Sequence, residues 1–220
     1  MSGRSWLTRA SILAAALSLS GCFGWVDNNL TQAPNPWRRL TPADLPVTLP
    51  NSPQFPIVAG RTRATGAIYT SYMVVLGNPT TLPGENRLAL DVHTLPDSPL
   101  GMFVQPPRVF PVPLYSSQTL AETLAREFPG MKAKVADAAR RNRYGDYDYA
   151  VAQDATNTCV LAWQLLSDHD RMLPRRIEAI RLEYRVCGTD RNPRALLRVF
   201  DGMVLTLPET VLEIDDLKRL

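Results

Sequence analysis

Two neighbouring segments, each with one cysteine, constrain the fold of this chain more than any other feature. Residues 178–187 alternate strictly between polar and apolar side chains, which is typical of a β-strand with one buried face. Residues 158–166 are almost entirely apolar and are predicted to form a second strand. The polar loop between them contains Pro174, so the two segments are predicted to be antiparallel neighbours in a sheet.

The first 22 residues have the features of a bacterial lipoprotein leader. Arg4 and Arg9 precede the apolar run 10–20, which is shorter than the roughly 20 residues that a membrane-spanning helix needs. The run leads into the tetrapeptide Leu-Ser-Gly-Cys, which ends at Cys22 and resembles the lipobox, where the cysteine is lipidated and becomes the mature N-terminus. We expect a signal peptide over residues 1–21 and a lipid on Cys22. An ordinary secretory signal and a buried helix are the alternatives.

The residue after Cys22 bears on the location of the protein. It is Phe23 and not aspartate, which by resemblance to enterobacterial sorting rules favours the outer membrane. We therefore expect a protein that is lipid-anchored in the bacterial envelope and faces the periplasm.

The other two cysteines, Cys159 and Cys187, are an even pair in an exported chain, which predicts one disulfide. If they lie directly opposite each other on the two strands, Glu178 falls opposite Asp168 and the polar loop closes the hairpin. Such a bond stabilises the fold by about 3–4 kcal/mol, because it restricts the unfolded chain.

The same register divides the side chains of this strand pair between two faces. One is a predicted core face, formed by Val160, Ala162, Leu166, Ile180, Leu182, Tyr184 and Val186. The other sets Leu161, Trp163 and Leu165 against Arg185, Glu183 and Arg181. Two interpretations of the second face are open. A helix or loop covers it, or Trp163 with Arg181 and Arg185 forms a surface for a partner or a glycan.

Tyr147 and Tyr149 are further candidates for stacking on sugar rings. They share one face of a predicted strand, because side chains two residues apart point to the same side. The alternative is that both are ordinary core aromatics, since stacking requires an exposed face.

Prolines are concentrated near the N-terminus of the mature chain. Seven of them fall within 23 residues, at Pro34, Pro36, Pro42, Pro46, Pro50, Pro53 and Pro56. Proline prevents helix formation and favours extended chain. We interpret residues 22–66 as a Pro-rich tether between the membrane and a folded domain. A Pro-rich ligand for a partner domain is the alternative.

The remaining patterns predict a single α+β domain over residues 67–205, with a mostly antiparallel sheet and about two packed helices. Strands are expected at 67–76, 87–93, 147–152, 158–166 and 178–187, and helices at 117–128 and from Asn192 to near Gly202. The first two strands are predicted to pair as a hairpin with a long loop. Residues 131–136 fit either a strand or a helix, and 206–220 is read as a C-terminal tail.

Charge and motifs exclude several function classes. The net charge is +3, and two of the positive charges lie in the leader, so nothing indicates a nucleic-acid partner. His93 and His169 have no metal-binding spacing, and the sequence lacks nucleotide-binding and GxSxG motifs. His93 shares a predicted strand face with Asp91, but no nucleophile accompanies them. The aspartate pairs read as turn residues: Asp146 with Asp148, and Asp168 with Asp170. We expect no catalytic residue, metal site or cofactor.

Four segments share a distinctive pattern with one known family. They are residues 83–88 (PGENRL), 142–150 (NRYGDYDYA), 159–164 (CVLAWQ) and the arginine-rich strand that ends at Cys187. Together with the leader, they resemble the BcsN family of cellulose biosynthesis accessory proteins over residues 67–205. Asp146, Asp148 and Leu161 depart from the pattern expected for that family.

The resemblance implies a role beside a cellulose synthase complex, without enzyme activity. The expected function is a non-catalytic, membrane-anchored lipoprotein accessory to the synthesis or export of cellulose, an exopolysaccharide. The competing class is an outer-membrane lipoprotein of a secretion, pilus or conjugation apparatus, which would share the leader, the tether and the disulfide. The expected partners are the synthase complex or other envelope-machinery subunits and the membrane itself, with polysaccharide as a further candidate.

Overall fold

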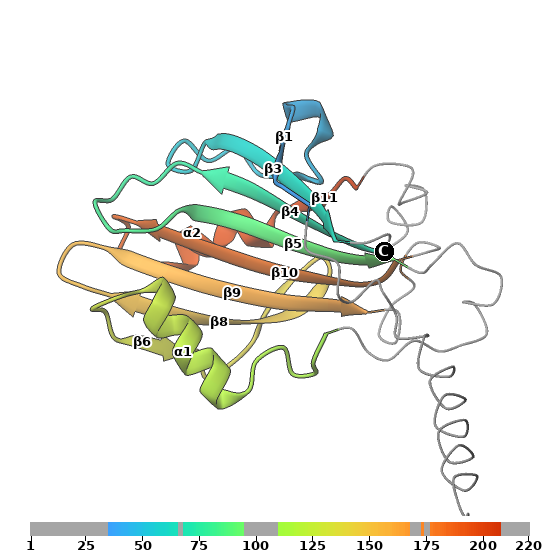
Figure 1. Cartoon of the computed structure of the whole chain (residues 1–220). Coiled ribbons are helices and arrows are strands. Elements are labelled where there is room, and N and C mark those ends of the chain that lie inside the picture. Colours follow the sequence, from blue (N-terminus) through green and yellow to red (C-terminus); the bar gives the residue numbers. More distant parts are fainter. Residues whose placement is uncertain (1–34, 66–67, 95–109, 168–172, 174–176, 208–220) are drawn as a thin grey trace, which may run out of the picture.

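The computed structural model describes residues 35–65, 68–94, 110–167, 173 and 177–207. In these residues the chain forms one large antiparallel sheet with a helix on each face (Figure 1). The spatial order of its strands is β1 (Arg38–Leu40), β3 (Ile57–Thr65), β4 (Tyr69–Leu76), β5 (Asn86–Thr94), β10 (Ile177–Gly188), β9 (Thr158–Ser167), β8 (Gly145–Gln153) and β6 (Ala133–Val135). The short β7 (Arg140–Asn142) also pairs with β8, and β2 (Val47–Thr48) pairs separately with β11 (Val204–Leu205).

The predicted cysteine-bearing strand pair is confirmed together with its register. Cys187 on β10 lies opposite Cys159 on β9, and the pairing runs without a shift from Gly188–Thr158 to Ala179–Ser167. A disulfide joins the two cysteines, whose Cα atoms are 4.0 Å apart. The predicted hairpin is also confirmed, because β4 pairs antiparallel with β5. The open choice over residues 131–136 is settled in favour of a strand, β6.

Both predicted helices are present. α1 (Ser117–Glu127) begins at Ser116, whose side chain accepts a hydrogen bond from a backbone N–H of the first turn. α2 (Pro193–Asp201) begins at Asn192, which caps it in the same way, and its first residue is proline. A short 3-10 helix, η1 (Pro42–Asp44), follows β1. No helix in the described part of the chain is long and apolar enough to cross a bilayer.

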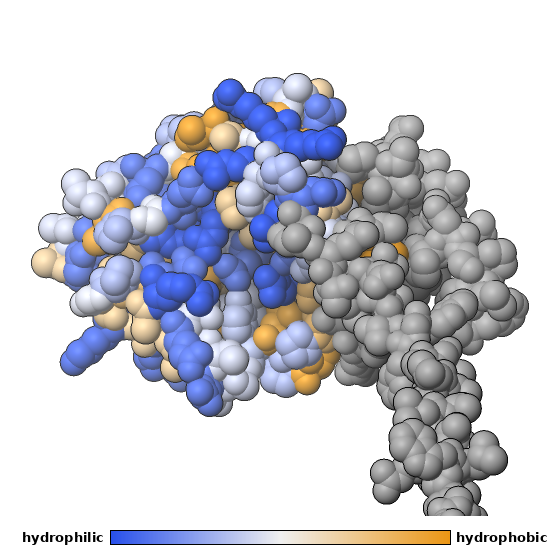
Figure 2. Space-filling view, in the orientation of Figure 1, coloured by the Kyte–Doolittle hydropathy of each residue, from blue (hydrophilic) through white to orange (hydrophobic). Residues whose placement is uncertain are grey.

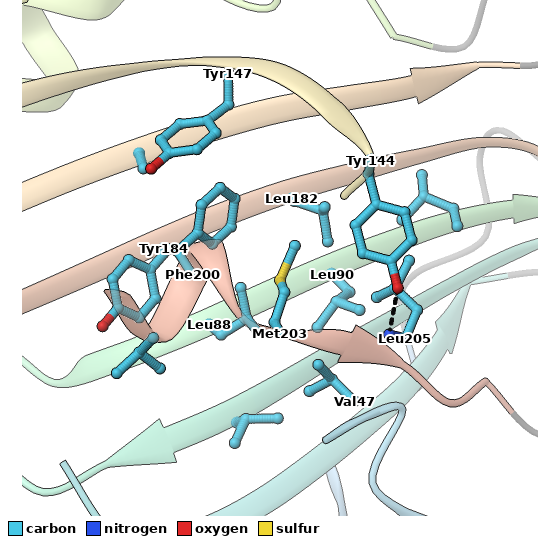
Figure 3. Close-up of a cluster of buried hydrophobic side chains, with 14 of the residues drawn as sticks. Val47, Leu88, Leu90, Tyr144, Tyr147, Leu182, Tyr184, Phe200, Met203 and Leu205 are labelled. Atoms are coloured by element: carbon cyan, nitrogen blue, oxygen red, sulfur yellow. Dashed lines mark hydrogen bonds between the residues drawn. The ribbon is translucent and has the colours of Figure 1, made fainter. Parts of the chain in front are cut away.

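The two faces of the sheet bury different clusters. The larger core lies between the sheet and the layer formed by α2, β2 and β11 (Figure 3). It contains the whole predicted core face, and Phe200 of α2 stacks on Tyr184 of β10 with ring centroids 5.5 Å apart. A smaller cluster lies under α1 on the opposite face and includes the disulfide. The α+β class with a mostly antiparallel sheet and two helices is therefore confirmed.

The Pro-rich segment is part of the fold from residue 38 onward, which corrects the prediction of a tether over 22–66. Strand β3 pairs along its length with β4, and β1 pairs with β3, so both belong to the main sheet. Val47 and Phe55 are buried in the larger core. The prolines lie mostly between these short strands, where proline costs no sheet hydrogen bond. Residues 22–34 of the predicted tether lie outside the described residues.

The C-terminal boundary also differs from the prediction. Leu207 is buried in the larger core, and the Thr206 backbone N–H donates to the Pro46 carbonyl at 2.8 Å. The folded domain thus extends beyond residue 205. The leader, Cys22 and residues 208–220 lie outside the described residues.

Candidate functional site

Trp163 and Arg185 are covered, so they do not form the surface that one interpretation of the sequence proposed. Trp163 is 7% exposed and packs against the Tyr115 ring edge to face, with centroids 5.4 Å apart. The α1 side chains of Leu120 and Leu124 belong to the same cluster. The interpretation in which a helix covers this face is the correct one. Arg181 is the partial exception: 38% of its side chain is exposed, and it forms an ion pair with a neighbouring strand.

Tyr147 belongs to the core and Tyr149 is half-buried against it, so the two rings do not form an exposed stacking surface. Tyr147 is 2% exposed, and Tyr149 packs against the larger core. The Tyr147 hydroxyl donates to Asp201 of α2 and accepts a hydrogen bond from Arg140 at 3.1 Å. Burial, reinforced by the bond to Asp201, raises the pKa of Tyr147 well above its ordinary value. This tyrosine therefore fastens α2 to the sheet.

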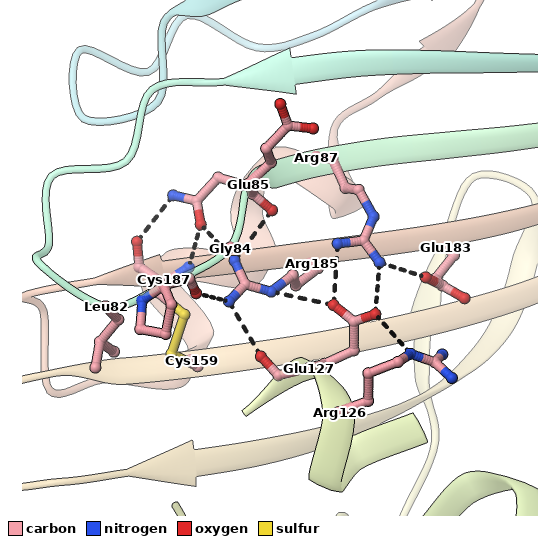
Figure 4. A network of polar contacts seen from close by, with 12 residues as sticks. Leu82, Gly84, Glu85, Arg87, Arg126, Glu127, Cys159, Glu183, Arg185 and Cys187 are labelled. Atoms are coloured by element: carbon pink, nitrogen blue, oxygen red, sulfur yellow. Dashed lines mark hydrogen bonds and ion pairs between the residues drawn. A yellow bond between two sulfur atoms is a disulfide. The ribbon is translucent and has the colours of Figure 1, made fainter. Parts of the chain in front are cut away.

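Arg185 is held in a cage of backbone carbonyls (Figure 4). Its Nη1 donates to the carbonyl of Glu85 at 3.0 Å, and its Nη2 donates to the carbonyls of Pro83 at 2.8 Å and Glu127 at 3.1 Å. Glycine is required at position 84 for two reasons, its backbone conformation and the closeness of Arg185. Its φ of +95° suits glycine, and a Cβ there would lie 2.8 Å from Arg185 Nη2.

Glu127, at the end of α1, supplies the counter-charge to this arginine. Its carboxylate accepts two hydrogen bonds from Arg87, at 2.8 and 3.0 Å, and lies 3.3 Å from Arg185 Nε. Burial acts to raise the pKa of Glu127, but the hydrogen bonds and charge of Arg87 and the charge of Arg185 outweigh it and lower the pKa. The network therefore ties α1, β5 and β10 together through paired charges.

A second polar network fixes the turn between β7 and β8. Asn142 donates to the Gln164 side chain of β9 at 2.8 Å and accepts from the Tyr144 backbone at 2.8 Å. Gly145, with a φ of +114°, turns the chain. The Tyr144 hydroxyl then accepts a hydrogen bond from the backbone of Leu205 at 2.8 Å.

The serine, aspartate and histidine side chains that neighbour one another on β4 and β5 are held in structural contacts. Ser71 donates to Asp91 at 2.7 Å, and the second oxygen of Asp91 lies 2.7 Å from Arg181. His93 instead faces Glu178, with Nδ1 and Oε2 2.7 Å apart. Burial lowers the pKa of His93, with Glu178 acting in the opposite direction. Among the described residues, the side-chain partner of Ser71 is thus a carboxylate paired with arginine and not a histidine base.

Metal chemistry has no support in the described residues either, where no three His, Cys, Asp or Glu side chains come together to hold an ion. Asp146 and Asp148 are exposed, and Asp146 forms a surface ion pair with Arg141. Residues 168–170, with the other aspartate pair and His169, lie outside the described part.

The exposed feature that the sequence reasoning missed is a basic edge of the sheet. We define the edge cluster as Trp37, Arg38, Arg39, Arg61 and Arg63, which lie on β1, on the residue before it, and on β3. Arg39 lies directly opposite Arg61 in the β1–β3 pairing, and the Arg63 guanidinium lies 4.5 Å from the centroid of the Trp37 ring. Like charges opposite each other on neighbouring strands destabilise a sheet, so this arrangement favours an anionic ligand. The alternating Arg-Thr-Arg of residues 61–63 could have indicated a strand with two arginines on one face. It was not used because the segment was interpreted as a tether.

The charge of the edge cluster is only partly compensated. Arg61 pairs with Glu85 at 3.0 Å, whereas no described carboxylate lies within ion-pair distance of Arg38, Arg39 or Arg63. Figure 2 shows strongly hydrophilic side chains beside hydrophobic ones over β1 and β3. The edge cluster is therefore the candidate binding site of the described domain.

Comparison with protein families matches residues 47–213 of the chain to "Cellulose biosynthesis protein BcsN". The chain belongs to the BcsN family. Searches of the curated proteins and of the solved structures give no match. The BcsN match begins inside the Pro-rich segment, in agreement with the structure, where β2 and β3 belong to the domain.

Residues 83–88, 142–150 and 159–164, the segments on which the sequence predicted this family, build the two polar networks. Residues 83–88 supply the carbonyl cage of Arg185, and Asn86 bonds to both backbone groups of Cys187, at 2.8 and 3.0 Å. Residues 142–150 and 159–164 supply the turn network, which Asn142 and Gln164 close. In this chain these segments therefore stabilise the fold.

Proposed function

We propose that this protein is a non-catalytic lipoprotein that assists cellulose synthesis or export from the membrane surface. Membership of the BcsN family carries the proposal, because it assigns the chain to cellulose biosynthesis. The lipobox-like leader supports the anchor. The hydrogen bonds and ion pairs of Ser71, Asp91, His93 and Glu127 support a non-catalytic role, since each is engaged with a structural partner.

The proposed anchor and the domain lie close together along the chain. Twelve residues lie between Cys22 and Asn35, the first described residue, so the two Cα atoms are at most about 45 Å apart along a fully extended chain. A domain on so short a connection stays close to the membrane, so we expect it to act by holding a partner there. It would hold a subunit of the cellulose machinery, or the emerging polymer, near the membrane that carries the lipid.

Deletion of the gene is expected to reduce or mislocalise cellulose without abolishing synthase activity. An accessory protein is needed for delivery of the polymer, whereas the chemistry belongs to the synthase. Cellulose on intact cells and glucan synthesis by isolated membranes should both be measured, with the wild-type gene restored as a control. Normal yield and location of cellulose in the deletion strain would refute the proposed function.

Substitution of Cys22 by serine is expected to release the protein from membranes, because the lipid and not a helix holds it. Fractionation of cells should move the variant from the membrane pellet to the soluble fraction, and a fatty-acid label should mark the wild type alone. A wild type that takes up no fatty-acid label, or a Cys22→Ser variant that still takes it up, contradicts lipidation at this site. The cellulose phenotype of the same strain then shows whether anchoring is required.

A further inference from the structure

The strands nearest the N-terminus concentrate the unbalanced charge of the domain. Residues 35–65 contain four arginines and one acidic residue, Asp44. The other described residues contain twelve basic and twelve acidic side chains, so they are balanced. The positive charge is therefore a property of one edge of the sheet and not of the domain as a whole.

The same edge concentrates exposed apolar side chains. Of the five large hydrophobic residues that are exposed in the described part, Trp37, Ile57 and Val58 lie here, at 37%, 44% and 61% exposure. Ile57 and Val58 also line a groove of about 420 Å³, together with Leu40, Pro42, Leu45 and Ala59, and Arg39 stands at its rim. Arginine beside exposed tryptophan and aliphatic residues is typical of a surface that enters the headgroup region of a bilayer.

We propose that the edge cluster, with Ile57 and Val58, is a docking surface for an anionic phospholipid bilayer. Arg38, Arg39 and Arg63 lack carboxylate partners among the described residues. Arg38 and Arg39 are exposed and available to lipid phosphates, whereas Arg63 is half-buried beside Trp37 and adds positive charge to the surface. The apolar side chains beside them would enter the interface. Because residue 35 begins the described domain, this edge is also the part closest along the chain to Cys22. To that extent the inference rests on the proposed anchor.

Docking at this edge would orient the domain. A lipid on Cys22 by itself limits only the distance of the domain from the bilayer, whereas a surface contact also fixes which face points away from it. With β1 and β3 on the membrane, the opposite end of the sheet, at β8 and β6, would be the part presented to other components.

The test measures binding of the full chain carrying Cys22→Ser, which has no lipid, to vesicles. Vesicles of phosphatidylcholine containing about one third phosphatidylglycerol are compared with vesicles of phosphatidylcholine alone. The edge variant is Arg38→Glu/Arg39→Glu, and the matched control is Arg143→Glu/Arg194→Glu, two exposed arginines elsewhere on the domain. Both variants change the charge equally, so their difference reports position. Equal unfolding midpoints establish that both are folded.

The edge variant should bind anionic vesicles at least about tenfold more weakly than the control variant, because each arginine near an anionic surface contributes measurably to binding. Val58→Asn should also weaken binding without a change in charge, since it removes an inserted side chain. Equal binding by the edge and control variants overturns the proposal. The proposal is also overturned if the edge variant binds vesicles as well as the control variant does but is retained less on carboxymethyl-cellulose. That result would assign the edge to an acidic glucan. Neither result depends on lipidation or on the cellulose phenotype, so failure here is separate from failure of the proposed function.

Discussion

Replacement of Arg185 by alanine is expected to lower the free energy of unfolding by more than about 3 kcal/mol. The side chain is 1% exposed, and its guanidinium satisfies the backbone carbonyls of Pro83, Glu85 and Glu127. Alanine would leave these acceptors without donors and remove a positive charge from beside the Glu127 carboxylate. Each unsatisfied buried group costs about 1–3 kcal/mol, and the cavity left by the side chain adds to the loss.

Urea unfolding of the purified protein measures this effect. Arg141→Ala is the matched control, because Arg141 also pairs with a carboxylate, that of Asp146, but the two side chains are 74% and 66% exposed. An exposed pair is worth at most about 1 kcal/mol. Arg185→Lys should destabilise almost as much as alanine, since an ammonium group cannot reproduce the planar set of donors. If Arg185→Ala costs no more than the control, the carbonyl cage does not stabilise the domain.

Removal of the disulfide has the second largest expected effect. The double variant Cys159→Ala/Cys187→Ala should unfold with a free energy lower by about 3–4 kcal/mol, because the bond closes a loop between residues 28 apart in sequence. Native pairing of β9 with β10 is expected to survive, since the bond adds to a ladder of backbone hydrogen bonds and to a core that surrounds it on the α1 face.

Reduction of the wild type provides the control for this prediction. A thiol reductant should lower the stability of the wild type to near that of the double variant and leave the variant unchanged. Mapping of peptides without reduction should recover Cys159 linked to Cys187. Free thiols at both positions in protein isolated from the periplasm would show that the bond does not form in the cell.

The parts of the fold that the sequence predicted depend on patterns within short segments. The strict alternation of 178–187 defines its own buried face, and two cysteines fix its register against the neighbouring strand. The caps at Ser116 and Asn192 are equally local. These features persist in any tertiary setting, which is why the sheet, the disulfide and both helices could be inferred.

The parts that could not be predicted depend on distant partners. Arg185 is surrounded by carbonyls of a loop about one hundred residues earlier, so its alternation with Glu183 and Arg181 looks like that of an exposed face. Trp163 is buried only because α1 and Tyr115 pack on it. Strand β3 follows Pro56 and contains Gly60, and both residues weaken the strand propensity of this segment. Backbone hydrogen bonds to β4 stabilise the strand instead. The candidate site was missed for the same reason, because the edge cluster exists only once β1 and β3 have paired.

The pairing of β2 with β11 has a consequence for how the domain comes into being. Val47 lies opposite Leu205, so β2, one of the first strands of the domain, pairs with β11, the last described strand. Val47 and Phe55 therefore have no complete core to enter unless α2 and β11 are present in the same chain. A chain that stops before α2 leaves one whole apolar face of the sheet open to chaperones and proteases. The first strands of the domain therefore depend for their stability on the last described strand, at the other end of the sequence.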